Sequence, residues 1–211
     1  MKRAFLFLGR VFLPLLWVYL GYGVLISACA GFGDIDGTFL GGYYRMFPMV
    51  PVLCLFLFGT SSGTYLALSL SLGCRRRDYL AAAQGVLAAN ALACTVLTAL
   101  FLSLPGRLGW TWVEPFMSPD QLPLLLLLTV AAGELSTAVG LLLRTRRWLA
   151  VLLSALSVFA LVAALAYIGV AAQLNWPVLE RLARPAAAMA AALIALGLFI
   201  CVRQTRRAVV R

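Results

Sequence analysis

Long apolar stretches separated by short polar ones form the dominant pattern of this chain. Each stretch has about the 17 to 25 residues that an α-helix needs to cross the hydrocarbon core of a bilayer, and the second and third are long enough to tilt or protrude. The pattern predicts an all-α integral membrane protein with one transmembrane domain over residues 1–211. The six predicted spans cover residues 11–30, 46–72, 79–104, 122–143, 148–170 and 185–202.

Composition supports the same class. The chain is 64% hydrophobic and 11% charged, with a mean hydropathy of +1.00, whereas a soluble domain is about half apolar. The formal net charge of +10 would suggest a nucleic-acid partner in a soluble protein. In a membrane protein, basic residues first mark topology, so we expect the lipid bilayer as a partner and no nucleic acid.

The basic residues predict the orientation of the spans. An even number of spans places both termini on one side. Of the 17 basic residues, all except Arg45, Arg107, Arg181 and Arg184 fall on the side of the termini. Because cytoplasmic segments carry the excess of Lys and Arg, we expect both termini in the cytoplasm.

The N-terminus allows two interpretations. Lys2-Arg3, followed by an apolar stretch that ends in Ile26-Ser27-Ala28-Cys29, also looks like a lipoprotein signal peptide. The apolar run of residues 11–28 is longer than the hydrophobic region of an ordinary signal peptide. This favours a first span preceded by a short basic and aromatic segment, with Phe5 and Phe7, that lies along the inner leaflet.

Several chemistries lack the residues they need. The chain has a single lysine, Lys2, and no histidine, so a Walker A loop, a Ser-His dyad, an H-E-x-x-H zinc site and a histidine proton relay are excluded. The five cysteines are odd in number and have no C-x-x-C spacing, which is typical of small buried hydrophobic residues. We therefore expect no catalytic residue, metal site or cofactor in this chain.

The motif Gly59-Thr60-Ser61-Ser62-Gly63 matches the G-x-S-x-G pattern of a serine nucleophile on a sharp turn. Without histidine, however, the serine lacks its usual base. The motif instead favours a small-residue interruption of the second span, where neighbouring helices approach closely or the helix kinks.

Glu134 is the only formal charge deep inside a predicted span. It precedes Arg144 by ten residues, which places it about 15 Å from the end of its helix at 1.5 Å per residue. An ionised carboxylate there costs at least a few kcal/mol unless it is paired, protonated or hydrated. Spans two, three and four are predicted to form one polar layer at this depth, which either lines a pathway or only fixes packing. Its members are Thr60, Ser61, Ser62, Thr64, Asn90 and Glu134.

The segment of residues 73–79 joins the second and third spans through three successive arginines. Such a run most often anchors lipid phosphate and marks topology. Its neighbours add more, because Gly73 can end one helix and Asp78 can cap the next. We therefore expect a tight turn carried rigidly by two long helices, so that a push on the turn reaches both.

Tyr65-Leu66-Ala67-Leu68-Ser69-Leu70-Ser71-Leu72-Gly73-Cys74-Arg75-Arg76-Arg77-Asp78-Tyr79-Leu80 resembles the ALSLG-x-(S/T)-RR-(D/x)-(F/Y) segment of small bacterial six-span permeases of the ABC-2 type. It departs from that segment at Cys74-Arg75, where Ser or Thr is usual. The resemblance implies that the turn is a coupling helix docked on a separate ATPase subunit, which holds ATP and Mg²⁺. The contact residues it implies are Gly73, Arg75, Arg76, Arg77, Asp78 and Tyr79.

The expected function is that of a permease subunit of an ATP-driven ABC transporter in the bacterial cytoplasmic membrane. The chain would be no enzyme itself, would pair with a second copy or a sister permease, and would export an amphipathic, peptide or drug-like substrate. Two alternatives remain. One is a six-span substrate-binding subunit of an energy-coupling-factor importer, although the A-x-x-x-A docking face of such subunits is missing from residues 11–30. The other is an ion- or proton-coupled carrier that uses Glu134.

Overall fold

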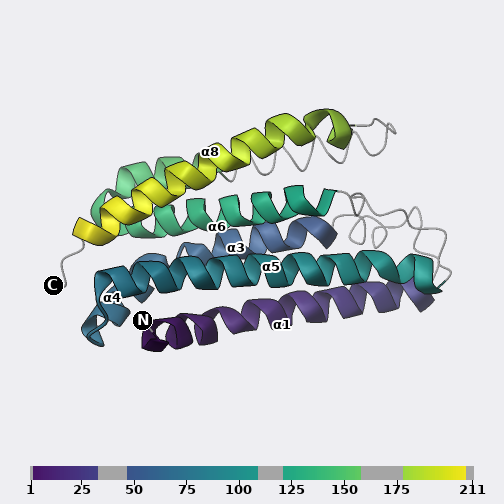
Figure 1. The fold of residues 1–211 in the computed structure, drawn as a ribbon, viewed down its shortest axis with the longest axis horizontal. Helices are drawn as coiled ribbons and strands as arrows, with labels where there is room; N and C mark the ends of the chain where they lie inside the picture. Colours follow the sequence, from purple (N-terminus) through teal and green to yellow (C-terminus); the bar gives the residue numbers. More distant parts are fainter. Residues whose placement is uncertain (1, 33–46, 109–120, 158–177, 208–211) are drawn as a thin grey trace.

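The computed structural model describes residues 2–32, 47–108, 121–157 and 178–207, and within these ranges the chain is helical, with short turns and no strand. The predicted all-α class is confirmed for this part of the chain. The elements are α1 (Lys2–Phe32), the short 3₁₀ helix η1 (Phe47–Met49), α3 (Val50–Gly59), α4 (Ser62–Ser71), α5 (Arg76–Leu108), α6 (Leu122–Thr145), a short apolar helix (Arg147–Ser157) and α8 (Val178–Arg207) (Figure 1).

Four of these helices contain segments long and apolar enough to cross a membrane: Arg3–Cys29, Arg76–Leu104, Leu122–Thr145 and Arg184–Arg207. The consecutive helices α3 and α4 make a fifth crossing if the bent pair is counted as one span. The predicted span at 148–170 begins in the helix Arg147–Ser157, and its residues 158–170 lie outside the described part of the chain. The protein is thus membrane-embedded, with four or five candidate crossing helices among the described residues.

Helix α1 differs from its prediction. It begins at Lys2 and runs without interruption, so residues 2–10 do not form a separate segment along the membrane surface. The reason is the helical spacing of its buried side chains, which starts at Ala4 and Leu8 and continues through Phe12. Phe7 also contacts the bundle, with its ring 6.5 Å from that of Tyr65 in an edge-to-face arrangement.

Helix α6 is the central helix of the bundle. It packs against α3, α4, α5 and α8, while α1 lies along α5 on the outer side (Figure 1). Every residue from 133 to 142 is buried. A helix enclosed in this way can carry polar side chains that a lipid-facing helix cannot.

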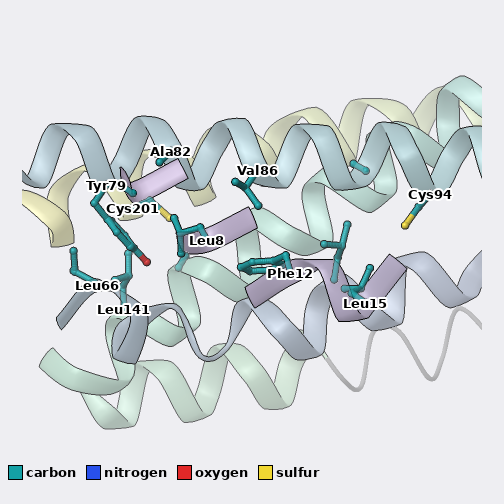
Figure 2. Packing of buried hydrophobic residues seen from close by; sticks show 14 of the residues in the cluster. Leu8, Phe12, Leu15, Leu66, Tyr79, Ala82, Val86, Cys94, Leu141 and Cys201 are labelled. Atoms are coloured by element: carbon teal, nitrogen blue, oxygen red, sulfur yellow. The ribbon is translucent and has the colours of Figure 1, made fainter. Parts of the chain in front are cut away.

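The core between α1, α5 and the neighbouring helices is filled by apolar side chains (Figure 2). Toward the end of this core that lies away from residues 73–79, the Tyr19 and Thr98 hydroxyl oxygens are 2.6 Å apart. The Tyr19 ring stacks on the Phe47 ring, with the ring centres 4.8 Å apart. Since lipid tails are as apolar as these side chains, close packing and such interhelical hydrogen bonds hold the helices together. The labelled members of the core are Leu8, Phe12, Leu15, Leu66, Tyr79, Ala82, Val86, Cys94, Leu141 and Cys201.

Candidate functional site: the turn of residues 73–79 and the polar contacts of α6

The turn of residues 73–79 begins with a complete glycine cap on α4. Gly73 has a positive φ of 80°, a conformation that suits glycine. Its main-chain N–H donates to Leu70 O at 3.0 Å, and that of Cys74 donates to Ser69 O at 3.0 Å. These two bonds make a Schellman motif, so the prediction that Gly73 ends this helix is confirmed.

Helix α5 begins at Arg76, three residues after Gly73. Asp78 therefore stands in the first turn of the helix, where a negative charge favours the helix dipole, rather than at the capping position predicted for it. Arg75 precedes the helix, and its carbonyl accepts the N–H of Tyr79 at 3.0 Å. Gly73, Arg75, Arg76 and Arg77 are exposed, so they form the accessible surface of the turn.

Tyr79 has a different position from the arginines before it. Its side chain is only 2% exposed, and its hydroxyl donates to the main-chain oxygen of Ser62 at 3.0 Å. Figure 2 shows its ring directed into the core, near Leu66 and Leu141. Tyr79 therefore links the first turn of α5 to the start of α4 and does not belong to the exposed surface of the turn.

The turn also contacts the end of α8. The Arg76 Nη1 donates to Arg206 O at 3.0 Å. A second contact at this end of the bundle joins α6 to α8, with 3.1 Å between Thr145 Oγ1 and Gln204 Oε1. The N-terminal ends of α1 and α5 and the C-terminal ends of α6 and α8 thus lie together (Figure 1), and the described arginines of this end are all exposed. They are Arg3, Arg10, Arg75, Arg76, Arg77, Arg144, Arg146, Arg147, Arg203, Arg206 and Arg207.

Glu134 lies on α6 and is 2% exposed. Gln84 of α5 donates from Nε2 to Glu134 Oε2 at 3.1 Å, and the Cys201 thiol of α8 lies 3.9 Å from the same oxygen. Gly197 of α8 packs directly on this residue, since a Cβ added there would lie 2.8 Å from Glu134 Cβ. The carboxyl group is therefore enclosed by protein from three helices, as the cost of a charge in lipid requires.

The small-residue interruption of the second span is confirmed. Helix α3 ends at Gly59, α4 begins at Ser62, and the two helix axes meet at 47°. Gly59 packs against Ser136 of α6, and Gly63 packs against the backbone of Gly140, so closely that a Cβ on either glycine would collide. Both parts of the prediction, the kink and the close approach, are therefore found at this motif.

Polar contacts within the break hold its shape. Thr60 Oγ1 donates to Leu57 O at 2.6 Å, and Ser62 Oγ donates to Gly59 O. From α6, Ser136 Oγ lies within hydrogen-bond distance of Leu55 O, at 3.2 Å. The Thr60 and Ser62 hydroxyls satisfy main-chain oxygen atoms at the point where the helix is interrupted, as a membrane environment requires. Ser136 Oγ is closer to Gly133 O of its own helix, at 2.9 Å, than to Leu55 O.

The structure divides the predicted polar layer. Glu134 contacts α5 and α8, whereas the break in the second span contacts α6 nearer the basic end, from Ser136 to Gly140. Ser62 is buried at the break, and Ser61 and Thr64 are exposed. Asn90 is also buried, but it donates to Val86 O of its own helix at 2.8 Å, and it lies six residues, or about 9 Å, beyond Gln84 along α5.

Three residues that join α6 to its neighbours were not predicted from the sequence. They are Gln84 of α5 and Cys201 of α8, which contact Glu134, and Ser136 of α6, which contacts α3. Gln84 is one of two side-chain amides in the predicted span 79–104, the other being Asn90, and this was the available signal for it. Cys201 and Ser136 resemble many other small residues of the spans and give no such signal. Among the described residues, no three His, Cys, Asp or Glu side chains come together in a way that would hold a metal ion.

Comparison with known proteins gives no relative. No family model, no curated protein and no solved structure matches this chain.

Proposed function

We propose that this chain is the permease subunit of an ATP-driven ABC-type transporter and that it binds a separate cytoplasmic ATPase through the turn of residues 73–79. One observation carries the proposal. The turn exposes three arginines, yet it is fastened to the bundle at two points, by Tyr79 to Ser62 and by Arg76 to Arg206. A surface that is both accessible and rigidly connected can pass a movement of a bound partner to the helices.

The mechanism follows from these connections. Closure of the ATPases on ATP displaces the turn, and the Tyr79–Ser62 hydrogen bond carries the displacement to the start of α4. Since α3 is held against α6 at Gly59, α4 changes its angle at the break, and the Arg76–Arg206 contact moves the end of α8 with it. Such packed elements alternate between two discrete arrangements, as switching between inward-open and outward-open states requires.

The full proposal includes six spans with both termini in the cytoplasm of a bacterial cell. It also includes a second permease, either a copy of this chain or a sister subunit, and ATP and Mg²⁺ held by the ATPase. An amphipathic, peptide or drug-like substrate suits spans that are mostly apolar. Export rather than import is supported by the resemblance of residues 65–80 to ABC-2 permeases.

Glu134 favours a second candidate, a proton-coupled carrier. Its carboxyl group is buried between three helices and accepts a hydrogen bond from Gln84, and buried carboxyl groups in spans are often part of a pathway. This carrier would need no ATPase, so the two candidates differ in their energy source.

Co-expression with an ATP-binding subunit encoded in a neighbouring reading frame tests the proposal. We expect a stable complex that hydrolyses ATP in proteoliposomes and loses hydrolysis when the Walker A lysine of that subunit is replaced. Purification of this chain without the ATPase, together with uptake driven by a proton gradient alone, would support the carrier instead.

A further inference from the structure

A second basic turn, residues 143–149, spans the end of α6 and the start of the helix Arg147–Ser157. Helix α6 ends at Thr145, and only Arg146, with φ of −143° and ψ of 77°, separates the two helices. All seven residues of this turn are exposed, and Trp148 is 89% exposed. The turn therefore projects from the end of the bundle.

The chemistry of this turn differs from that of residues 73–79. In the first turn the aromatic residue, Tyr79, is buried. In the second turn, Trp148 is exposed and follows Arg146 and Arg147 in the sequence. The apolar side chains of Leu149 and Leu152, which come next along the helix, are exposed as well. Arginine recognises phosphate, tryptophan prefers the headgroup level of a bilayer, and exposed leucines suit acyl chains. This order of groups matches the profile of one leaflet of a membrane.

Electrostatics favours an anionic ligand here. The sequence has no Asp or Glu between Glu134 and Glu180 and none after Glu180, so no acidic neighbour along the chain neutralises the second basic turn. The contact between Thr145 and Gln204 places the end of α8 beside it, with the exposed Arg203, Arg206 and Arg207. Clusters of four to eight basic residues at the end of membrane helices attract anionic lipids.

We propose that the second basic turn binds the phosphate groups of anionic phospholipids in the leaflet at this end of the bundle. Arg144, Arg146 and Arg147 hold the phosphates, and Trp148 lies among the headgroups. We expect at least about a tenfold preference for anionic over zwitterionic phospholipid, since each of the three arginines contributes severalfold to binding near an anionic surface.

Quenching of Trp148 by brominated lipids measures this preference directly. The variant has Phe at Trp17, Trp110, Trp112 and Trp176, so that Trp148 alone fluoresces, and it is reconstituted in vesicles of phosphatidylcholine with increasing brominated phosphatidylglycerol or brominated phosphatidylcholine. We expect half-maximal quenching at a clearly lower mole fraction of the anionic lipid. Equal quenching by the two lipids would overturn the proposal.

Charge variants locate the preference. Substitution of Arg144, Arg146 and Arg147 by Gln should remove most of the preference, and substitution by Lys should retain most of it. Substitution of Arg75, Arg76 and Arg77 by Gln should change it much less. A preference that persists in the first variant, or that millimolar inorganic phosphate removes at constant ionic strength, would overturn the assignment to lipid. The measurement uses this chain alone, so its outcome is independent of the proposed ATPase.

Discussion

The Tyr79 hydroxyl donates a 3.0 Å hydrogen bond to the main-chain oxygen of Ser62, across the space between the first turn of α5 and the first turn of α4. This bond joins the basic turn to the point where the second span is interrupted. A movement applied to the arginines therefore reaches the interruption without passing through the whole length of α4.

Substitution of Tyr79 by Phe tests this bond. The ring keeps its place in the core, so only the hydrogen bond is lost, and we expect the free energy of unfolding to fall by about 1 kcal/mol. Tyr65→Phe is the matched control, because the Tyr65 ring packs edge-to-face on Phe7 and Phe12 and its hydroxyl makes no hydrogen bond within the described part of the chain. Thermal unfolding in detergent, followed by fluorescence, measures both. Equal melting temperatures for the two variants would contradict the role of Tyr79.

Gly73→Ala should destabilise the cap of α4. The φ of 80° is unfavourable for alanine by about 1 to 2 kcal/mol, although no atom lies within 4 Å of the added Cβ. The control is Gly21→Ala, which also meets no atom within 4 Å but lies inside helix α1. There alanine should be neutral or stabilising. The melting temperature should fall for Gly73→Ala and should stay the same or rise for Gly21→Ala. An unchanged melting temperature for Gly73→Ala would argue against the Schellman cap.

Gly197→Ala should force α8 away from α6. Its Cβ would lie 2.8 Å from Glu134 Cβ and 3.0 Å from the Glu134 carbonyl carbon, distances too short to accommodate without a shift of a helix. Overpacking of this kind costs about 1 to 3 kcal/mol. With Gly21→Ala again as the control, the melting temperature should fall, and the spacing of single cysteines across α6 and α8 should widen in cross-linking assays. An unchanged melting temperature would indicate that Gly197 of α8 does not pack on Glu134 of α6.

Glu134→Gln separates the two candidate functions. Glutamine has nearly the same shape and keeps an acceptor for Gln84 Nε2, so the packing of α5, α6 and α8 should survive. If the chain is a permease driven by an ATPase, the Glu134→Gln variant should retain ATP-driven transport. Glu134→Ala, which leaves a cavity and removes the partner of Gln84, should be less stable. Complete loss of transport in a correctly folded Glu134→Gln variant would instead assign the carboxyl group to a proton pathway.

Much of the helical framework is predictable from hydropathy, since a span needs a long apolar run wherever it lies in the bundle. The end of α4 at Gly73 and the break at Gly59 are predictable too, because glycine and clusters of small residues act locally. The depth of the Thr60–Thr64 cluster is not predictable in the same way, because hydropathy does not reveal the 47° bend, and the Tyr79 hydroxyl reaches Ser62 O at this bend.

Neither was the partner of Glu134 predictable. Asn90 and Gln84 lie on the same apolar run, and hydropathy does not say which of them faces α6 at the level of the carboxyl group. The contribution of α8 through Gly197 and Cys201 depends on the packing of helices far apart in sequence. Only the arrangement of the bundle supplies that information.

Co-purification of the ATPase with variants of the two basic turns tests the central claim most directly. Replacement of Arg75, Arg76 and Arg77 by Ala should leave the protein inserted and folded but should reduce the bound ATPase at least tenfold, because these arginines form the exposed surface of the first turn. Replacement of Arg144, Arg146 and Arg147 by Ala removes the same charge from the same end of the bundle and should leave the bound ATPase largely unchanged. Undiminished ATPase binding by the first variant, or an equal loss in both, would contradict coupling through residues 73–79.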